Sequence, residues 1–352
     1  MLKFPDLQEM LPKGESMTPR QEPGQSAPNS DRIAVLLATY NGEKYLDEQM
    51  RSLFGQTYRN FVVIARDDHS SDRTPAILAR WAEENRDQMI VVSDERGNLG
   101  SRDNFSLLME RCDSPYFAFC GQDDIWMPRK LEVSIKTIQQ MESRFGRGMP
   151  LMVHSDVKVV DDSLQEISQS FFAYRSIDVT LDTRLDHLLF NCCVLGCSLM
   201  ANRVLLELAN PIPEDSPFED WWVALVAASC GAIQTILEPT LLYRQHGNNQ
   251  CGAGGHQTQP TLWDARHLFQ QPNLLRTRMM KVLEILQSRA DLLLRAVGTE
   301  MHGENRKFLF AFCLPRRRNE VTCLPLSRRV SLFTRSILVY ARALPLILRW
   351  CH

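Results

Sequence analysis

The sequence has no hydrophobic run of the length that a membrane-spanning helix requires. Its apolar late segment, residues 328–350, is interrupted by arginines and falls well short of roughly 18 continuous apolar residues. The first residues also lack the basic start, apolar core and cleavage site of a secretory signal. We therefore expect a cytoplasmic protein.

The ten cysteines lack the repeated spacing of a structural zinc site. The densest group is Cys192, Cys193 and Cys197, which lies in an apolar segment without a second ordered pair or matching histidines. This pattern argues against metal binding by cysteine. It is typical of small buried side chains in a reducing compartment.

Two phosphate-binding loops are also missing. The apolar run Ile33–Thr39 predicts a buried strand, but the turn after it, Thr39–Lys44, lacks the spaced glycines of dinucleotide oxidoreductases. A phosphate-binding loop ending in Lys-Ser or Lys-Thr is absent as well. A bound diphosphate would therefore need another partner, such as a metal ion held by carboxylates.

The net charge is small, but the charges are unevenly distributed along the chain. The net charge is −2, yet residues 301–352 contain ten Lys or Arg against two acids, which places +8 there and −10 on the remainder. Such asymmetry suits an anionic membrane surface or a nucleic acid. The arginines and apolar residues of 328–350 fit an interfacial amphipathic helix or a helix packed on the main domain.

The remaining pattern predicts an α/β fold. Apolar strand signals at 33–39, 61–65, 89–92, 117–120 and 151–155 alternate with helical periodicity. This succession favours a mostly parallel central sheet with helices on both faces. We expect a disordered proline-rich leader at 1–31, a main domain at 32–252 whose halves meet near residue 150, and a helical basic C-terminal extension at 253–352.

Acidic pairs follow two of the predicted strands. Asp67-Asp68 comes after the second strand and Asp123-Asp124 after the fourth. Ligands bind at the carboxyl ends of strands in open α/β sheets, and paired carboxylates there suit a divalent cation holding a diphosphate. The alternative for each pair is a turn or helix-capping role. Arg102, at the start of a helix, could face the diphosphate or lie on the surface.

Six ordered motifs carry a family resemblance. They are Ala38–Gly42, Arg66–Asp72, Asn98–Gly100, Gln122–Trp126, Glu219–Trp222 and Tyr243–Asn249. Over residues 32–252 the chain resembles family 2 glycosyltransferases of the GT-A fold, and is most similar to bacterial rhamnosyltransferase-like enzymes that build surface polysaccharides. The resemblance implies a dTDP- or UDP-sugar donor.

The resemblance implies roles for the donor side. The Thr39-Tyr40 turn would lie against the nucleobase, and Asp68 would accept hydrogen bonds from that base. Asp123 would touch the ribose, and Asp124 would bind Mg²⁺ or Mn²⁺. Gln122 replaces the first acid of the common three-residue motif.

It also implies roles for the acceptor side. Asp220 would be the general base, with Glu219 and Trp221 beside the sugar or acceptor; the alternative is a pair of acids satisfying a helix dipole. Asp156 would face the donor sugar or acceptor, or else cap a turn. His246 would be a metal or diphosphate ligand, or else a surface histidine.

The sequence thus predicts an inverting, metal-dependent glycosyltransferase of cell-surface polysaccharide synthesis, of the O-antigen or capsule kind. Its acceptor would be a glycan or a lipid-linked glycan, reached from the inner face of the cytoplasmic membrane, with no nucleic acid as partner. The alternatives are a noncatalytic sugar-nucleotide-binding or scaffold protein of the same pathway, and a nucleotidyltransferase.

Overall fold

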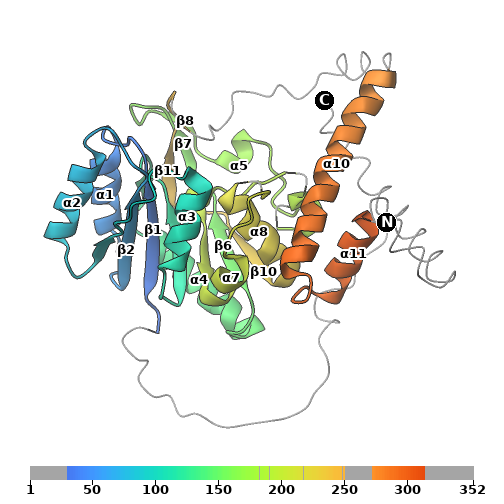
Figure 1. The fold of residues 1–352 in the computed structure, drawn as a ribbon. Coiled ribbons are helices and arrows are strands. Elements are labelled where there is room, and N and C mark those ends of the chain that lie inside the picture. Colours follow the sequence, from blue (N-terminus) through green and yellow to red (C-terminus); the bar gives the residue numbers. More distant parts are fainter. Residues whose placement is uncertain are drawn as a thin grey trace, which may run out of the picture. The chain divides into compact units, whose positions relative to one another are not determined.

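A seven-stranded sheet forms the centre of the computed structural model (Figure 1). The structure describes residues 30–181, 183–189, 191–216, 218–247, 249 and 272–313, with the side chains of 272–283, 311 and 312 left out. Residues 1–29 of the predicted leader and residues 328–350 lie outside these ranges.

The strand order in this sheet is β10-β6-β9-β4-β1-β2-β3. The strands are β1 (Ile33–Thr39), β2 (Phe61–Asp67), β3 (Met89–Val91), β4 (Tyr116–Cys120), β6 (Leu151–Ser155), β9 (Met200–Asn202) and β10 (Ala232–Ile236). All neighbouring pairs are parallel except those of β9, which runs antiparallel to β4 and β6. The predicted mostly parallel sheet is confirmed, and the strands from both predicted halves belong to it.

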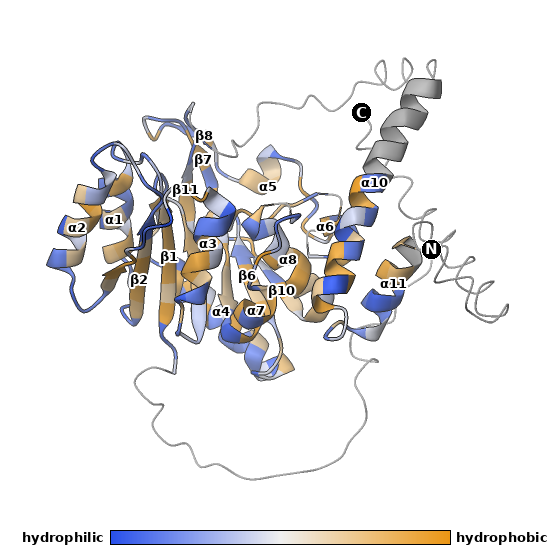
Figure 2. Cartoon of the chain, in the orientation of Figure 1, coloured by the Kyte–Doolittle hydropathy of each residue, from blue (hydrophilic) through white to orange (hydrophobic). Residues whose placement is uncertain are grey.

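Both faces of the sheet are buried, because alternate residues of its strands enter different cores. In β1, Ala34 and Leu36 join one hydrophobic cluster, whereas Ile33, Val35 and Leu37 join the other. In Figure 2 the central strands are coloured mostly as hydrophobic, while the surrounding helices carry both colours. This is the continuous apolar strand pattern of a sheet covered on two sides.

Helices cover each face. The cluster containing Ile33 is completed by α1 (Leu46–Phe54), α2 (Thr74–Glu84) and α4 (Lys130–Phe145). The opposite cluster takes residues from α3 (Ser101–Glu110), α6 (Leu185–Leu188), α7 (Arg203–Ala209), α8 (Glu219–Cys230), α10 (Pro272–Val297) and α11 (Gly303–Cys313).

A second sheet of four short strands has the order β5-β11-β7-β8. It consists of β5 (Ile125–Trp126), β7 (Lys158–Val160), β8 (Glu166–Ser168) and β11 (Leu241–Arg244). A short helix, α5 (Phe171–Tyr174), follows β8. Since β5 directly follows the acids at 123–124 and pairs with β11, this sheet brings residues near 244 to those acids.

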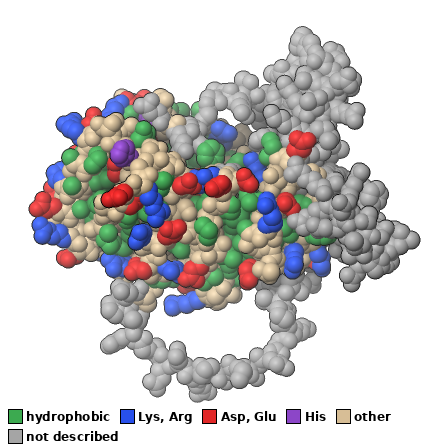
Figure 3. All heavy atoms as spheres, viewed as in Figure 1, with side chains coloured by type: hydrophobic (Ala, Val, Ile, Leu, Met, Phe, Trp, Pro, Cys, Tyr) green, Lys and Arg blue, Asp and Glu red, His purple; other side chains and the backbone are tan. Residues whose placement is uncertain are grey.

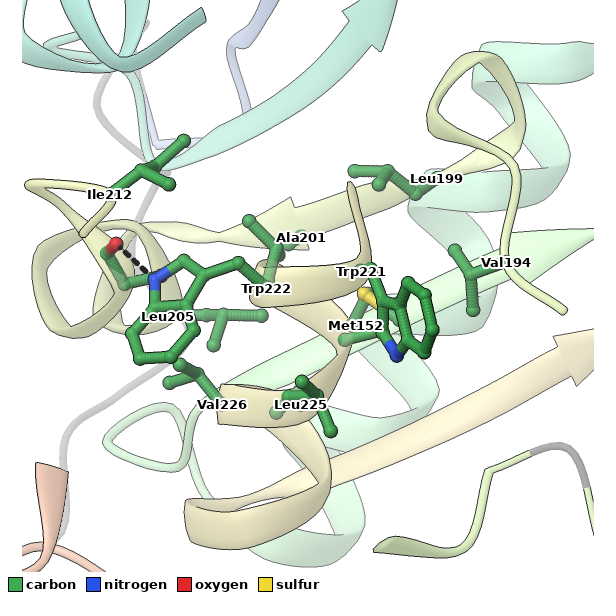
Figure 4. Packing of buried hydrophobic residues seen from close by; sticks show 14 of the residues in the cluster. Met152, Val194, Leu199, Ala201, Leu205, Ile212, Trp221, Trp222, Leu225 and Val226 are labelled. Carbon is green, nitrogen blue, oxygen red and sulfur yellow. Dashed lines mark hydrogen bonds between the residues drawn. The ribbon is translucent and has the colours of Figure 1, made fainter. Parts of the chain in front are cut away.

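Helix α8 is buried along nearly its whole length. Trp221 and Trp222 point into the core, and Trp222 Nε1 donates to the Ala209 carbonyl at 2.8 Å (Figure 4). Leu286, Ala290 and Leu293 of α10 belong to the same cluster. The described part of the predicted extension is therefore helical, as expected, and shares the core of the main domain.

The apolar segment 191–201 forms a strand only at its end. Residues 191–195 are irregular, and η2 (Gly196–Ser198) is a short 3₁₀ helix before β9. Gly196 and Ser198 instead turn the chain so that its backbone faces Asp220.

The surface carries both signs of charge. On the face shown in Figure 3, basic and acidic side chains are interspersed. No helix in the described ranges is long and apolar enough to cross a membrane.

Candidate active site

A cavity of about 470 Å³ lies at the carboxyl ends of β1 and β4. Most of its lining comes from four places: the turn after β1, the loop and start of α3, the residues after β4, and the start of α8 with η2. The residues are Ala38, Thr39, Tyr40, Asp68, Asn98, Gly100, Ser101, Asn104, Phe105, Gly121, Gln122, Asp123, Asp124, Leu195, Gly196, Cys197, Phe218, Glu219, Asp220, Tyr243 and Asn249. Most of the predicted site residues therefore share one cavity.

Asp68 is buried at the end of β2, where its carboxylate organises the loop before α3. Oδ1 accepts the Leu99 N–H at 2.8 Å, and Oδ2 accepts the Gly100 N–H at 2.8 Å. The Arg66 guanidinium donates to Oδ1 at 2.7 Å. Oδ2 accepts one such bond, and a carboxylate oxygen can accept a second, so Asp68 has capacity for a ligand donor.

Arg66 holds the loop before α3 in place, a role that the sequence did not predict. It is buried, forms a two-bond pair with Asp94 at 2.8 and 3.1 Å, and donates to the Gly97 carbonyl at 3.1 Å. The paired guanidinium holds the pKa of Asp94 well below its usual range. The visible signal is an arginine at the end of an otherwise apolar strand, where burial demands carboxylate partners.

The turn after β1 is held by the turn after β2. Thr39 Oγ1 donates to Asp67 at 3.0 Å, and the Asn41 N–H donates to Ser70 Oγ at 2.8 Å. The Tyr40 side chain is 51% exposed and lines the cavity. Thr39 and Tyr40 therefore lie at the mouth near Asp68, on a braced backbone.

Asp123 and Asp124 follow β4 in different surroundings. Asp124 is buried and accepts the Arg244 N–H at 3.1 Å and a hydrogen bond from the Cys197 thiol. Burial, and then the neighbouring Asp123 carboxylate, raise the pKa of Asp124 to about 8. A buried carboxylate beside a second one is a pair that a bound cation would stabilise.

His246 lies beside Asp123. Its Nε2 is 2.9 Å from Asp123 Oδ2, and its ring stacks on Tyr45 with centroids 4.6 Å apart. Two carboxylates and an imidazole are suitable ligands for Mn²⁺ or Mg²⁺. Among the residues that the structure describes, however, no three His, Cys, Asp or Glu side chains converge closely enough to hold an ion unaided.

Asp220 stands at the first turn of α8, facing η2. Its Oδ2 accepts the Gly196 N–H at 2.8 Å and its Oδ1 accepts the Trp221 N–H at 2.6 Å. Burial, and then Glu219, raise the pKa of Asp220 to about 7. A carboxylate with this pKa can take up a proton near neutral pH.

Glu219 lines the same end of the cavity. Its Oε1 accepts from Ser101 Oγ at 2.8 Å, and its buried Oε2 has no hydrogen-bond partner among the described residues. Phe218, which precedes it, is 46% exposed. This end thus combines carboxylates with an accessible aromatic ring.

Four predicted residues do not line the cavity, and one of them, His246, lines a second cavity instead. Arg102 pairs with Asp103 at 2.7 Å and donates to the Glu214 carbonyl. Asp156 is buried and accepts the backbone N–H groups of Phe171 and Phe172 at 2.9 and 3.2 Å. Trp221 lies in the core, where Nε1 donates to the Leu188 carbonyl at 2.6 Å.

Lys130 and Arg244 also support the site without having been foreseen. Lys130 is buried with Nζ 4.6 Å from the Trp126 ring centroid, and burial lowers its pKa to about 8, although Asp124 acts in the opposite direction. Arg244 donates through Nε to the Asp123 carbonyl at 3.0 Å and pairs with Glu48 at 2.5 Å. Both place positive charge near the acids.

Comparison with known proteins gives one family and one fold. Residues 34–145 match the model of glycosyl transferase family 2. An uncharacterised glycosyltransferase of Rickettsia typhi is 22% identical over 179 residues, which span 50% of this chain and about half, 53%, of the relative. The dTDP-rhamnosyl transferase RfbG of Shigella flexneri is 27% identical over 229 residues, covering 62% of this chain and 74% of the relative.

Among solved structures, residues 1–349 of S. aureus TarS in complex with UDP-GlcNAc superpose with a TM-score of 0.52. The identity is 17%, with 88% of this chain and 79% of that chain covered. At this identity the likeness concerns the fold alone: both chains have a GT-A type α/β architecture.

Proposed function

We propose that this chain, whose residues 34–145 match the model of glycosyl transferase family 2, transfers a sugar from a nucleoside diphosphate sugar to an acceptor hydroxyl. The observation that carries the proposal is one cavity joining the strand-end acids Asp68, Asp123 and Asp124 to the buried carboxylate Asp220. A noncatalytic binding protein has no use for a base with a pKa of about 7.

The donor occupies the end of the cavity near β1 and β2. The nucleobase of the donor lies against the Thr39-Tyr40 turn. Asp68 accepts a hydrogen bond from an N–H of this nucleobase through its remaining lone pair. The ribose contacts Asp123. A pyrimidine nucleotide, UDP or dTDP, fits this arrangement because each offers a ring N–H to a carboxylate.

Asp124, assisted by Asp123 and His246, holds Mg²⁺ or Mn²⁺, which when bound neutralises the negative charge that develops on the departing diphosphate. Without a bound metal ion, Arg244 and Lys130 provide positive charge near these acids. The contact of His246 Nε2 with Asp123 Oδ2 at 2.9 Å keeps these two side chains together.

Asp220 performs the proton transfer. It accepts the proton of the acceptor hydroxyl while that oxygen forms a bond to the anomeric carbon of the sugar. The bond from the anomeric carbon to the diphosphate breaks on the opposite side, so the electron pair leaves with the diphosphate and the configuration inverts. The Gly196 N–H holds Asp220 in place and leaves a lone pair on each oxygen.

The acceptor occupies the end beside α8. Phe218 offers an exposed ring to the apolar face of a sugar, and Glu219 offers a carboxylate to its hydroxyls. We propose a glycan or lipid-linked glycan of cell-surface polysaccharide synthesis as acceptor.

The test is hydrolysis and transfer with a panel of UDP-, dTDP- and GDP-sugars in the presence of Mg²⁺ or Mn²⁺. We expect turnover of at least one pyrimidine donor. Asp124→Asn should abolish turnover and donor-dependent metal binding without unfolding the protein, whereas Asp113→Asn, an exposed matched change, should have no effect. Binding of a donor without turnover under any condition would leave a noncatalytic sugar-nucleotide-binding protein.

A further inference from the structure

The Gln122 side chain makes a two-point contact with the backbone of Tyr40. The Tyr40 N–H donates to Gln122 Oε1 at 2.8 Å, and Gln122 Nε2 donates to the Tyr40 carbonyl at 2.9 Å. A primary amide satisfies a backbone donor and a backbone acceptor at once, as a neighbouring strand would. We call this contact the amide clamp.

Gly42 has no side chain and so leaves room for the amide clamp. A Cβ atom on Gly42 would lie 2.3 Å from Gln122 Oε1 and 2.5 Å from its amide carbon. Gly42 is not among the glycines with positive φ, so it is required here for space and not for backbone conformation. The Gly42 N–H donates to Thr74 Oγ1 at 2.8 Å, which fixes this turn from its other side.

The clamp stands between two cavities. Tyr40 and Gln122 line the main cavity and also a second cavity of about 470 Å³, whose other walls include Lys44, Tyr45 and His246. Gln122 is the residue before Asp123, whose carboxylate is 2.9 Å from His246. The clamp therefore joins the turn after β1 directly to the acids after β4.

We propose that Gln122 is a positioning residue that couples the turn carrying Thr39 and Tyr40 to the acids Asp123 and Asp124, so that nucleobase and diphosphate are bound at a fixed separation. The inference rests on the proposed function. It also explains why an acid is unsuitable at this position in this chain: a carboxylate cannot donate to the Tyr40 carbonyl and would repel it.

The test uses titration of UDP, dTDP and GDP in the presence of Mn²⁺, and of Mn²⁺ at a saturating concentration of the best-bound nucleotide, with melting temperature measured for every variant. Gln122→Ala and Gln122→Glu should lower the affinity for the best-bound nucleoside diphosphate about tenfold, since two hydrogen bonds are lost. Affinity for Mn²⁺ at a saturating concentration of that nucleotide should stay within twofold in Gln122→Ala and should not fall in Gln122→Glu. Gln140→Glu, the same change on the exposed side of α4, should alter neither.

A double-mutant cycle separates the clamp from other effects of the substitutions. Gly42→Ala should displace the Gln122 amide and reproduce the loss seen in Gln122→Ala, so the double variant should be no weaker than either single variant. Additive losses, or nucleotide affinity within twofold of wild type in Gln122→Ala, would overturn the inference. So would a parallel loss of Mn²⁺ affinity and melting temperature, which would make Gln122 merely structural. Failure of the wild-type protein to bind any of the three nucleotides would instead remove the proposed function, and the inference with it.

Discussion

At the scale of single residues, the surroundings of Asp220 set the conditions under which it can act. Two backbone N–H groups hold the carboxylate, while burial and Glu219 disfavour its charge. The N–H groups fix the orientation of the carboxylate, while burial and the Glu219 charge raise its proton affinity. Both are required of a base that must capture a proton from a hydroxyl near neutral pH.

The rate should therefore depend on pH in one direction. Below a pH of about 7 Asp220 is protonated and cannot accept the acceptor proton, so kcat/KM should fall tenfold per pH unit there and level off above it. Glu219→Gln removes a charge that raises the pKa of Asp220, and should move the break to lower pH. Asp220→Asn should bind the donor normally but lose transfer by about 10² to 10⁴.

These outcomes are measured as pH profiles of kcat/KM together with donor titration. A break that stays in place in Glu219→Gln would contradict the electrostatic account of Asp220. If donor affinity in Asp220→Asn fell as far as the rate, Asp220 would be a donor-binding residue and not the base.

Much of the site was predictable at this scale because strand-end acids are visible in the sequence. Asp68, Asp123, Asp124 and Asp220 were expected at the cavity, and all four line it. Arg102 could not be placed, since its position at a helix start leaves the direction of its side chain open.

The partners of other residues come from distant segments. Asp156 receives N–H groups from residues 171 and 172, and Arg244 reaches Glu48 across 196 positions. Sequence periodicity has no access to such pairings, because they arise only when the second sheet assembles beside the first.

At the scale of elements, α8 joins the proposed base to the core, and α10 supports it from behind. The Arg289 guanidinium lies 3.8 Å from the Trp221 ring centroid, and its Nη1 donates to the Leu189 carbonyl at 2.7 Å. Burial lowers the pKa of Arg289 to about 10, so the side chain remains charged at pH 7. The C-terminal region thus contributes directly to the support of the helix that carries Asp220.

Replacing Arg289 should be costly for stability. Arg289→Met keeps apolar length but removes the cation over Trp221 and leaves the Leu189 carbonyl unpaired, so we expect a loss of about 2–4 kcal/mol in unfolding free energy. Arg289→Lys should recover part of it. Urea denaturation measures both, and Arg295→Met, an exposed arginine of the same helix, should change stability by less than about 0.5 kcal/mol. Equal losses in the two variants would mean that the contact with Trp221 stabilises nothing.

At the scale of the whole molecule, the helices α10 and α11 share a hydrophobic core with α8. Composition changes near residue 253, but Leu286 and Leu309 lie in the same core cluster as α8. The α/β class was predictable from strand and helix periodicity. The antiparallel insertion of β9 was not, because three residues are too few to show a period.

The basic tail remains a sequence-based prediction for the whole protein. If residues 326–352 bind an anionic membrane, the full chain should sediment with vesicles containing phosphatidylserine, and less so as salt is raised, because exposed charges are screened over about 8 Å at physiological ionic strength. Truncation after residue 325 lies beyond α11 and should abolish sedimentation while retaining donor hydrolysis. Equal sedimentation with neutral vesicles, or full retention after truncation, would remove the proposed membrane contact.

The place of β9 in the sheet has a consequence for biosynthesis. β4 pairs with β1 on one side, and its other edge pairs with β9. At translation rates of about 5–20 residues per second, β9 leaves the ribosome seconds after β4. During that interval this edge of β4, whose five residues are all buried in the folded protein, has no β9 to pair with, and unpaired strand edges are prone to aggregation. Pairing with β9 therefore both completes the seven-stranded sheet and covers the edge of β4 at which the nascent chain could aggregate.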